Sequence, residues 1–194
     1  MKHKKALTLN SYTTKELRWD FYPMFVNLMR KGLETEAYLL MLSTWNFACF
    51  RYAVRNFNLD KFKLVFKELE PNFKRFKKLD FQTIDLDKYQ KDIKKIFFAL
   101  SDIKGVQKTG APKLMHLKVP QVFVMWDGYI RNYYGFKNGD ADDYFDFLKL
   151  MQKNFHNVKA HLGRTIAKLI DEHNFKTITE PALRKVKLKK KKKE

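Results

Sequence analysis

The sequence contains few residues that break helices and almost none that form disulfides. Its 194 residues include only 7 glycines and 5 prolines, too few for a disordered chain or a loop-rich β protein. The single cysteine, Cys49, excludes an intrachain disulfide and any metal site built from several cysteines. This fits a protein of the reducing cytoplasm, and we expect no metal and no cofactor.

Long apolar runs are also missing. The longest stretch without a charged residue, Ala37 to Phe50, has 14 residues and is too short to span a bilayer. The N-terminus lacks the apolar segment of a signal peptide. We expect no association with a membrane, and we read the stretch as a buried helix.

Acidic residues are outnumbered, because 40 lysines and arginines face 21 aspartates and glutamates, giving a formal charge of +19. The last segment, 184–194, holds eight basic residues and one acidic residue, so the rest of the chain still carries +12. Such an excess favours a polyanionic partner through phosphate neutralisation and release of counterions. A solvated surface that merely keeps the protein soluble is the simpler alternative.

What the sequence does contain is a helical apolar pattern, with 45% hydrophobic residues that include 18 phenylalanines. Apolar residues recur three and four positions apart, and capping residues precede several of these stretches. The pattern predicts an all-α fold, with a single helical domain over residues 1–183 and a disordered lysine-rich tail over 184–194. The expected helices cover about 13–31, 34–57, 60–76, 87–100, 112–117, 127–134, 140–172 and a last piece from 179, with a short extended segment at 119–124.

One turn, residues 103–111, stands out because two glycines precede a short helix. Glycine lets the backbone approach a ligand closely, and outward N–H groups before a helix can hold a phosphate. Lys104 and Lys108 add positive charge there. An ordinary helix–helix connection would use glycine in the same way.

This turn and the segment after it resemble the helix-hairpin-helix DNA glycosylases, the superfamily of endonuclease III and 8-oxoguanine DNA glycosylase. The family hairpin reads roughly L-P-G-V-G-x-K-T-A, and the chain reads I-K-G-V-Q-K-T-G-A at 103–111, with Lys104 replacing the proline and Gln107 the second glycine. A helix, a proline and an aspartate follow, as in the family, at K-V-P-Q-V-F-V-M-W-D. The resemblance implies a two-lobed fold with a cleft, a hairpin near 99–117, and DNA contacts from Lys104, Gly105, Gln107, Thr109 and Gly110.

The family's bifunctional members use a lysine that attacks the sugar C1′ and forms a Schiff base. Lys108 occupies the Lys-Thr position of the motif and lies 19 residues before Asp127, close to the family separation. Lys113 lies 14 residues before Asp127 but stands in the first turn of the expected helix. Spacing favours Lys108 and helix geometry favours Lys113, with Lys118 a distant third. A lysine in either place could also simply contact a phosphate.

Asp127 follows the apolar run 122–126, where a carboxylate is costly to bury without a role. It can cap the helix that begins at Gly128. The resemblance implies that it stabilises an oxocarbenium-like sugar and helps to activate the nucleophile, which is water if no lysine acts.

A weaker similarity lies at residues 43–50, which resemble the helix that supplies a base-opposing asparagine in the 8-oxoguanine glycosylase branch. It implies that Asn46 contacts an orphaned base or forms a wall of the base pocket. Trp45 and Trp126, with Phe47 and Phe50, could line that pocket, since enzymes of this kind hold an extruded base by stacking it on aromatic rings. A structural asparagine and core aromatics are the alternatives.

The resemblance thus implies a glycosylase that cleaves the N-glycosidic bond of a damaged base in double-stranded DNA, with or without lyase activity. We expect a monomer in the cytoplasm, associated with the nucleoid if the source is a prokaryote. The alternatives are a non-catalytic helix-hairpin-helix protein that binds nucleic acid and a structural helical protein.

Overall fold

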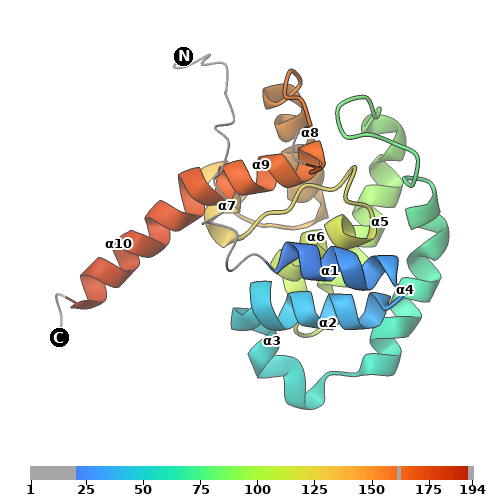
Figure 1. The fold of residues 1–194 in the computed structure, drawn as a ribbon, viewed down its shortest axis with the longest axis horizontal. Helices are drawn as coiled ribbons and strands as arrows, with labels where there is room; N and C mark the ends of the chain where they lie inside the picture. The colour runs from blue at the N-terminus through green and yellow to red at the C-terminus, as the bar shows by residue number, and fades with distance from the viewer. Residues whose placement is uncertain (1–20, 161–162, 192–194) are drawn as a thin grey trace.

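The computed structural model describes residues 21–160 and 163–191, and the regular structure of these ranges is helical throughout (Figure 1). This confirms the predicted all-α fold. The helices are α1 (Tyr22–Arg30), α2 (Glu34–Trp45), α3 (Phe47–Ala53), η2 (Val54–Asn56), α4 (Leu59–Lys74), η3 (Asp87–Tyr89), α5 (Gln90–Ser101), α6 (Gln107–Lys118), α7 (Gly128–Tyr133), α8 (Ala141–Asn154), α9 (Ile166–Asn174), η4 (Phe175–Thr179) and α10 (Glu180–Lys191).

Helix α6 lies at the centre of the fold. Its residues 110–117 are all buried, and it packs against α1, α2 and α5. Helix α5 also contacts α4 and α8, so the core continues on both sides of the α5–α6 pair. The predicted apolar stripe of α4 is confirmed, since Phe62, Phe66, Leu69 and Phe73 are buried and Phe76 follows them.

The predicted helix over 34–57 is wrong at its middle, because the chain is interrupted at Asn46. Helix α2 ends at Trp45 and α3 begins at Phe47. Helix α1 begins at Tyr22, and the capping box expected at Thr13 lies outside the described residues. The cap of α4 is Asn58, whose Oδ1 accepts a hydrogen bond from the Lys61 N–H (2.8 Å), and not Asp60.

Helix α6 begins at Gln107, five residues before the predicted start at Pro112. The residues expected to form a loop at 107–111 therefore form its first turns. The predicted extended segment 119–124 instead begins with a turn, in which the Val122 N–H donates to the Val119 carbonyl oxygen (3.2 Å). This segment is buried at Val122 to Val124 and carries the chain from α6 to α7.

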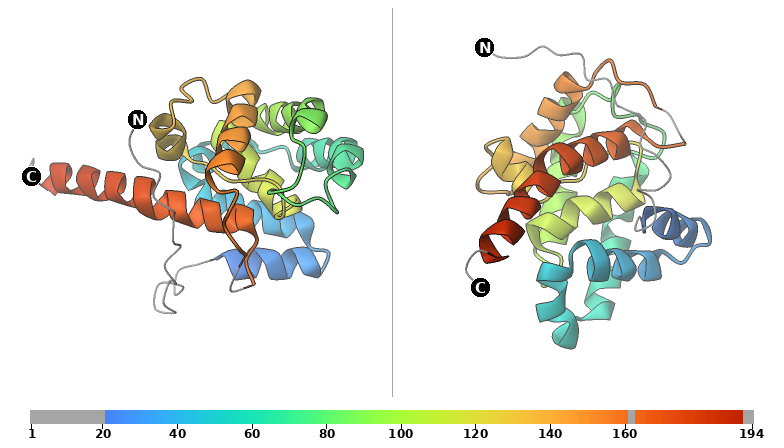
Figure 2. Two further views of the ribbon diagram at one scale, coloured as in Figure 1. Left: turned by 90° about the horizontal axis from the view of Figure 1, so that it is seen from above. Right: turned by 60° about the vertical axis from the view of Figure 1, so that its left-hand side comes forward.

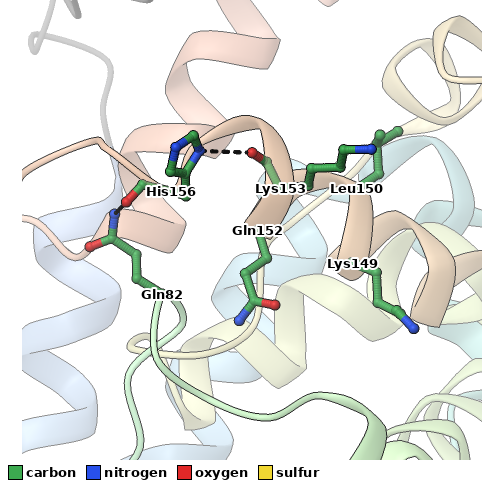
Figure 3. Close-up of a pocket in the computed structure, with 6 residues that line it drawn as sticks. All are labelled: Gln82, Lys149, Leu150, Gln152, Lys153 and His156. Atoms are coloured by element: carbon green, nitrogen blue, oxygen red, sulfur yellow. Dashed lines mark hydrogen bonds between the residues drawn. The ribbon is translucent and has the colours of Figure 1, made fainter.

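The predicted helix over 140–172 is also wrong at its middle. Its start is confirmed, because Asp140 Oδ1 accepts from the Asp143 N–H (2.9 Å), but α8 ends at Asn154 and α9 begins only at Ile166. Gln82 Nε2 donates to the carbonyl oxygens of residues 155, 156 and 158 at 3.1, 2.9 and 2.7 Å. Figure 3 shows the bond to His156. These bonds hold the chain in a turn beyond α8, which a local pattern does not reveal.

Helix α9 continues through the π-helical turn η4 into α10, and together they form a long rod that extends beyond the other helices (Figures 1 and 2). Residues 184–191 form the end of α10, and residues 192–194 lie outside the described part. Within the described ranges, every helix is too short or too polar to cross a membrane.

Candidate functional site

The connection between α5 and α6 has the form of a helix–turn–helix hairpin. Gly105 has a φ of +93°, and a Cβ there would lie 2.8 Å from the Cβ of Ala53, so the position requires glycine. Gln107 also has a positive φ, +54°, although it is not a glycine. This residue thus adopts the left-handed conformation that favours glycine.

Lys104, Gln107 and Lys108 are exposed on this hairpin, with Thr109 half-buried. The N–H groups of Lys108 and Thr109 lie in the first turn of α6, where a helix supplies no acceptor of its own. Lys108 Nζ donates to the carbonyl oxygen of Asn138 (2.7 Å), which ties the hairpin to the turn before α8. The hairpin thus offers donors and cations to an anion.

Asn46 is buried against this hairpin and holds it in place. Its Nδ2 donates to the carbonyl oxygens of Gly105 (2.9 Å) and Val106 (3.0 Å). Gly110 is buried in α6 beside it, and a Cβ at Gly110 would lie only 2.8 Å from Asn46 Nδ2. The Asn46 amide group therefore has a structural role: it fastens the break between α2 and α3 to the hairpin.

Trp126 lies in the core with a side chain that is 1% exposed, packed among Phe97, Tyr144 and Phe147. Pro112 explains the hydrogen bond of the Trp126 indole N–H. Proline has no N–H, so the Lys108 carbonyl oxygen lacks its usual partner in the helix, and Trp126 Nε1 donates to it instead (2.9 Å). The ring therefore supports α6 from within and does not line an open surface.

Lys113 is the buried lysine of α6. Its side chain packs toward the break after α2, where Nζ donates to the carbonyl oxygen of Trp45. Burial lowers the pKa of the Lys113 ammonium group, because a charge is poorly solvated there. The carboxylate of Asp127 is the strongest of the nearby charges that oppose this shift, followed by that of Asp171. The fold thus brings the Lys113 amine into the electrostatic field of Asp127.

Asp127 is half-buried and caps α7, as the sequence predicts. Its Oδ1 accepts from the N–H groups of Tyr129 (2.8 Å) and Ile130 (2.9 Å). Its Oδ2 accepts from Thr179 Oγ1 (2.7 Å), which comes from the π-helical turn η4. Both carboxylate oxygens are therefore held, and the acid has a fixed orientation between α7 and the rod.

A second buried lysine, Lys168 of α9, lies near the first and was not singled out by the sequence. Its Nζ pairs with Asp171 (2.9 Å) and lies 4.8 Å from the ring centroids of both Tyr22 and Trp45. The ring of Trp45 is half-buried and stacks on that of Tyr22, with centroids 6.2 Å apart. In the sequence, Lys168 is marked only by its position inside the apolar run Ile166–Ile170.

His116, one turn beyond Lys113 on α6, completes this buried group. Its Nδ1 lies 2.7 Å from the Phe123 carbonyl oxygen, which can only accept, so Nδ1 carries the proton. Nε2 then accepts from the Tyr22 hydroxyl (2.9 Å). Burial lowers the pKa of His116 to about 3, so the ring is neutral at pH 7.

The hollow drawn in Figure 3 lies elsewhere, beside α8. It is open, has a volume of about 580 Å³, and is lined by Gln82, Lys149, Leu150, Gln152, Lys153 and His156. Neither Lys113 nor Asp127 lines it. Two lobes with a cleft between them remain a prediction.

Chemically, the group around Lys113 offers an amine with a lowered pKa, an oriented carboxylate and a second acid, Asp171. This suits nucleophilic or proton-transfer chemistry at a cationic centre. Within residues 21–160 and 163–191, no group of three or more histidine, cysteine or acidic side chains could hold a metal ion. Comparison of the whole chain with protein-family models, with curated proteins and with solved structures finds no match.

Proposed function

We propose that this protein is a helix-hairpin-helix DNA glycosylase that removes a damaged base from double-stranded DNA, with Lys113 as the nucleophile. The observation that carries the proposal is the buried Lys113 amine, with its lowered pKa, in the field of the oriented Asp127 carboxylate. The proposal includes a monomeric protein in the cytoplasm. The strongly basic composition, +19 in formal charge, supports a nucleic-acid partner.

The proposed chemistry needs a neutral amine. Nζ of Lys113 attacks C1′ of the damaged nucleotide, the bond from C1′ to the base nitrogen breaks, and the base leaves with the bonding electrons and takes up a proton. Positive charge develops on the sugar as that bond weakens, and the carboxylate of Asp127 stabilises it. The lowered pKa of Lys113 raises the fraction of neutral amine above that of an exposed lysine.

Lys113 is a better candidate than Lys108 on physical grounds. Lys108 is exposed and its ammonium group donates to a backbone carbonyl, as a phosphate-binding or structural lysine would. The family spacing that favours Lys108 is therefore opposed by its surroundings. If neither lysine reacts, Asp127 could still activate water in a glycosylase without lyase activity.

A non-catalytic helix-hairpin-helix protein is the second candidate. It is favoured by the burial of Lys113, whose side chain must be reached by any substrate, and by the engagement of Asn46 and Trp126 in packing. Such a protein would use the hairpin donors and the basic surface to bind DNA without excision.

Borohydride trapping on a duplex with one abasic site tests the assignment of the nucleophile. We expect a covalent adduct with the unchanged protein and with Lys108→Gln, and its loss in Lys113→Gln. Lys108→Gln is the matched control because it removes the same charge from the same helix. An adduct that survives Lys113→Gln, or disappears only in Lys108→Gln, contradicts the assignment.

Single-turnover cleavage of oligonucleotides that carry 8-oxoguanine, uracil or an alkylated base tests the activity itself. Base release by the unchanged protein that Asp127→Asn abolishes supports a glycosylase. No release from any of these duplexes, together with no trapping, favours the non-catalytic candidate. Full activity in Asp127→Asn removes the role given to the acid.

A further inference from the structure

Helix α10 carries more positive charge than its own acidic residue can neutralise. Among its 12 residues, six are basic and one, Glu180, is acidic. Glu180 is paired with Arg184, whose Nη2 donates to its Oε1 (2.7 Å). Like charges four residues apart destabilise a helix, and lysines recur at that spacing at 185 and 189 and at 187 and 191. This charge therefore suits an anionic partner.

The place of α10 relates it to the candidate site. Helix α10 follows directly on η4. The last residue of η4, Thr179, donates a hydrogen bond to Asp127 Oδ2 (2.7 Å). From there α10 extends beyond the other helices, while α4 lies on the opposite side of the molecule (Figure 1). The start of α10 thus lies beside Asp127. A bound molecule longer than one nucleotide would reach it.

The length of α10 fits a stretch of nucleic-acid backbone. Twelve residues at about 1.5 Å each give a rod of about 18 Å. One strand of duplex DNA carries a phosphate about every 3.4 Å along the axis, so the rod spans about five phosphates. Its side chains at Arg184 and Lys185 are exposed at the near end of this rod.

We propose that α10 is an arm that binds the phosphate backbone of the double-stranded DNA whose reacting nucleotide lies at Lys113 and Asp127. The inference rests on the proposed function for the class of partner. The arm would neutralise phosphates beside the site and release their counterions, which adds affinity without reading sequence.

The test is the salt dependence of binding to an undamaged duplex, measured by fluorescence anisotropy. The arm variant replaces Lys185, Lys187, Lys189 and Lys190 by glutamine, which keeps a high helix propensity. The matched control replaces Lys61, Lys63, Lys67 and Lys74, exposed on α4, in the same way. Both variants lose four positive charges, so a difference between them reports position and not net charge.

For the arm variant we expect the slope of log affinity against log salt to become shallower by about 0.9 for each lost phosphate contact, up to about 3.6. The control variant should keep the slope of the unchanged protein. An unaltered slope in the arm variant, or an equal loss in the control, overturns the proposal. So does the absence of salt-dependent DNA binding by the unchanged protein.

Borohydride trapping of the same three proteins at low salt separates this inference from the proposed function. A reduced slope without any trapping supports the arm and removes the enzyme. Trapping with an unaltered slope overturns the arm and leaves the enzyme.

Discussion

His116 shows how a single side chain is set by its surroundings. It is fully buried between the Tyr22 hydroxyl and the Phe123 carbonyl oxygen, and this environment favours the neutral imidazole ring. Burial lowers its pKa to about 3, the Lys168 ammonium group acts in the same direction, and the bond to Phe123 opposes them. The unfolded chain has no such constraint and returns the ring to a pKa of about 6.5.

The free energy of unfolding should therefore depend on pH through His116. Between about pH 6.5 and 3 the unfolded chain binds a proton that the folded protein does not, so stability is complete above this window. It falls on acidification by about 1.4 kcal/mol per pH unit. Urea denaturation at pH 7, 6 and 5 measures the slope, which His116→Gln should reduce. His156→Gln, at an exposed position, is the control, and an unchanged slope in His116→Gln would contradict the account.

At the scale of elements, the start of α6 depends on hydrogen bonds from side chains that lie far from it in the sequence. Pro112 stands inside the helix, and the indole of Trp126 supplies the hydrogen bond that proline withholds from Lys108 (2.9 Å). The Asn46 amide supplies two more bonds to the carbonyls of the hairpin. Contacts from distant segments thus allow a helix to begin at Gln107, where the local pattern predicts a loop.

Gln107 adopts a φ of +54°, which costs an ordinary residue about 1–2 kcal/mol. Gln107→Gly should remove this strain, offset in part by the greater freedom of glycine in the unfolded chain. We expect a gain of about 0.5–1 kcal/mol in urea denaturation. Lys108→Gly, one residue further along α6, should instead lose about 1 kcal/mol. A loss of stability in Gln107→Gly would show that its side chain makes a contact worth more than the strain.

At the scale of the whole molecule, charge opposes folding. A formal charge of +19 on 194 residues repels itself in the compact state more than in the extended chain. Some opposite charges are paired, as in Lys118 with Glu34 (2.7 Å) and Glu70 (2.9 Å) and in Arg164 with Glu172 (2.7 Å). These pairs are partly buried, so salt screens them less than it screens the repulsion between exposed lysines.

Stability should therefore increase with salt. Raising sodium chloride from about 0.01 M to 1 M shortens the screening length from about 30 Å to 3 Å. We expect a gain of about 1 kcal/mol, which raises the melting temperature by about 2–4 °C for a chain of this size. Calorimetry at a series of salt concentrations measures it. A melting temperature that falls with salt would mean that the ion pairs outweigh the repulsion.

The features that the sequence determined are local ones. The all-α class, the buried stripe of α4 and the caps at Asp127 and Asp140 follow from residues within one or two turns of each other. Hydrophobic periodicity and capping act over that distance, so these features can be predicted without knowing how the helices pack.

Tertiary structure alone decided which of the two lysines is buried. Lys108 and Lys113 both stand at positions that the sequence allows, but only Lys113 is buried with Asp127 as its strongest opposing charge. The break at Asn46, the turn held by Gln82 and the bond from Thr179 to Asp127 join residues 52 to 76 positions apart. Burial and partners of this kind depend on how helices pack, and no pattern of neighbouring residues encodes them.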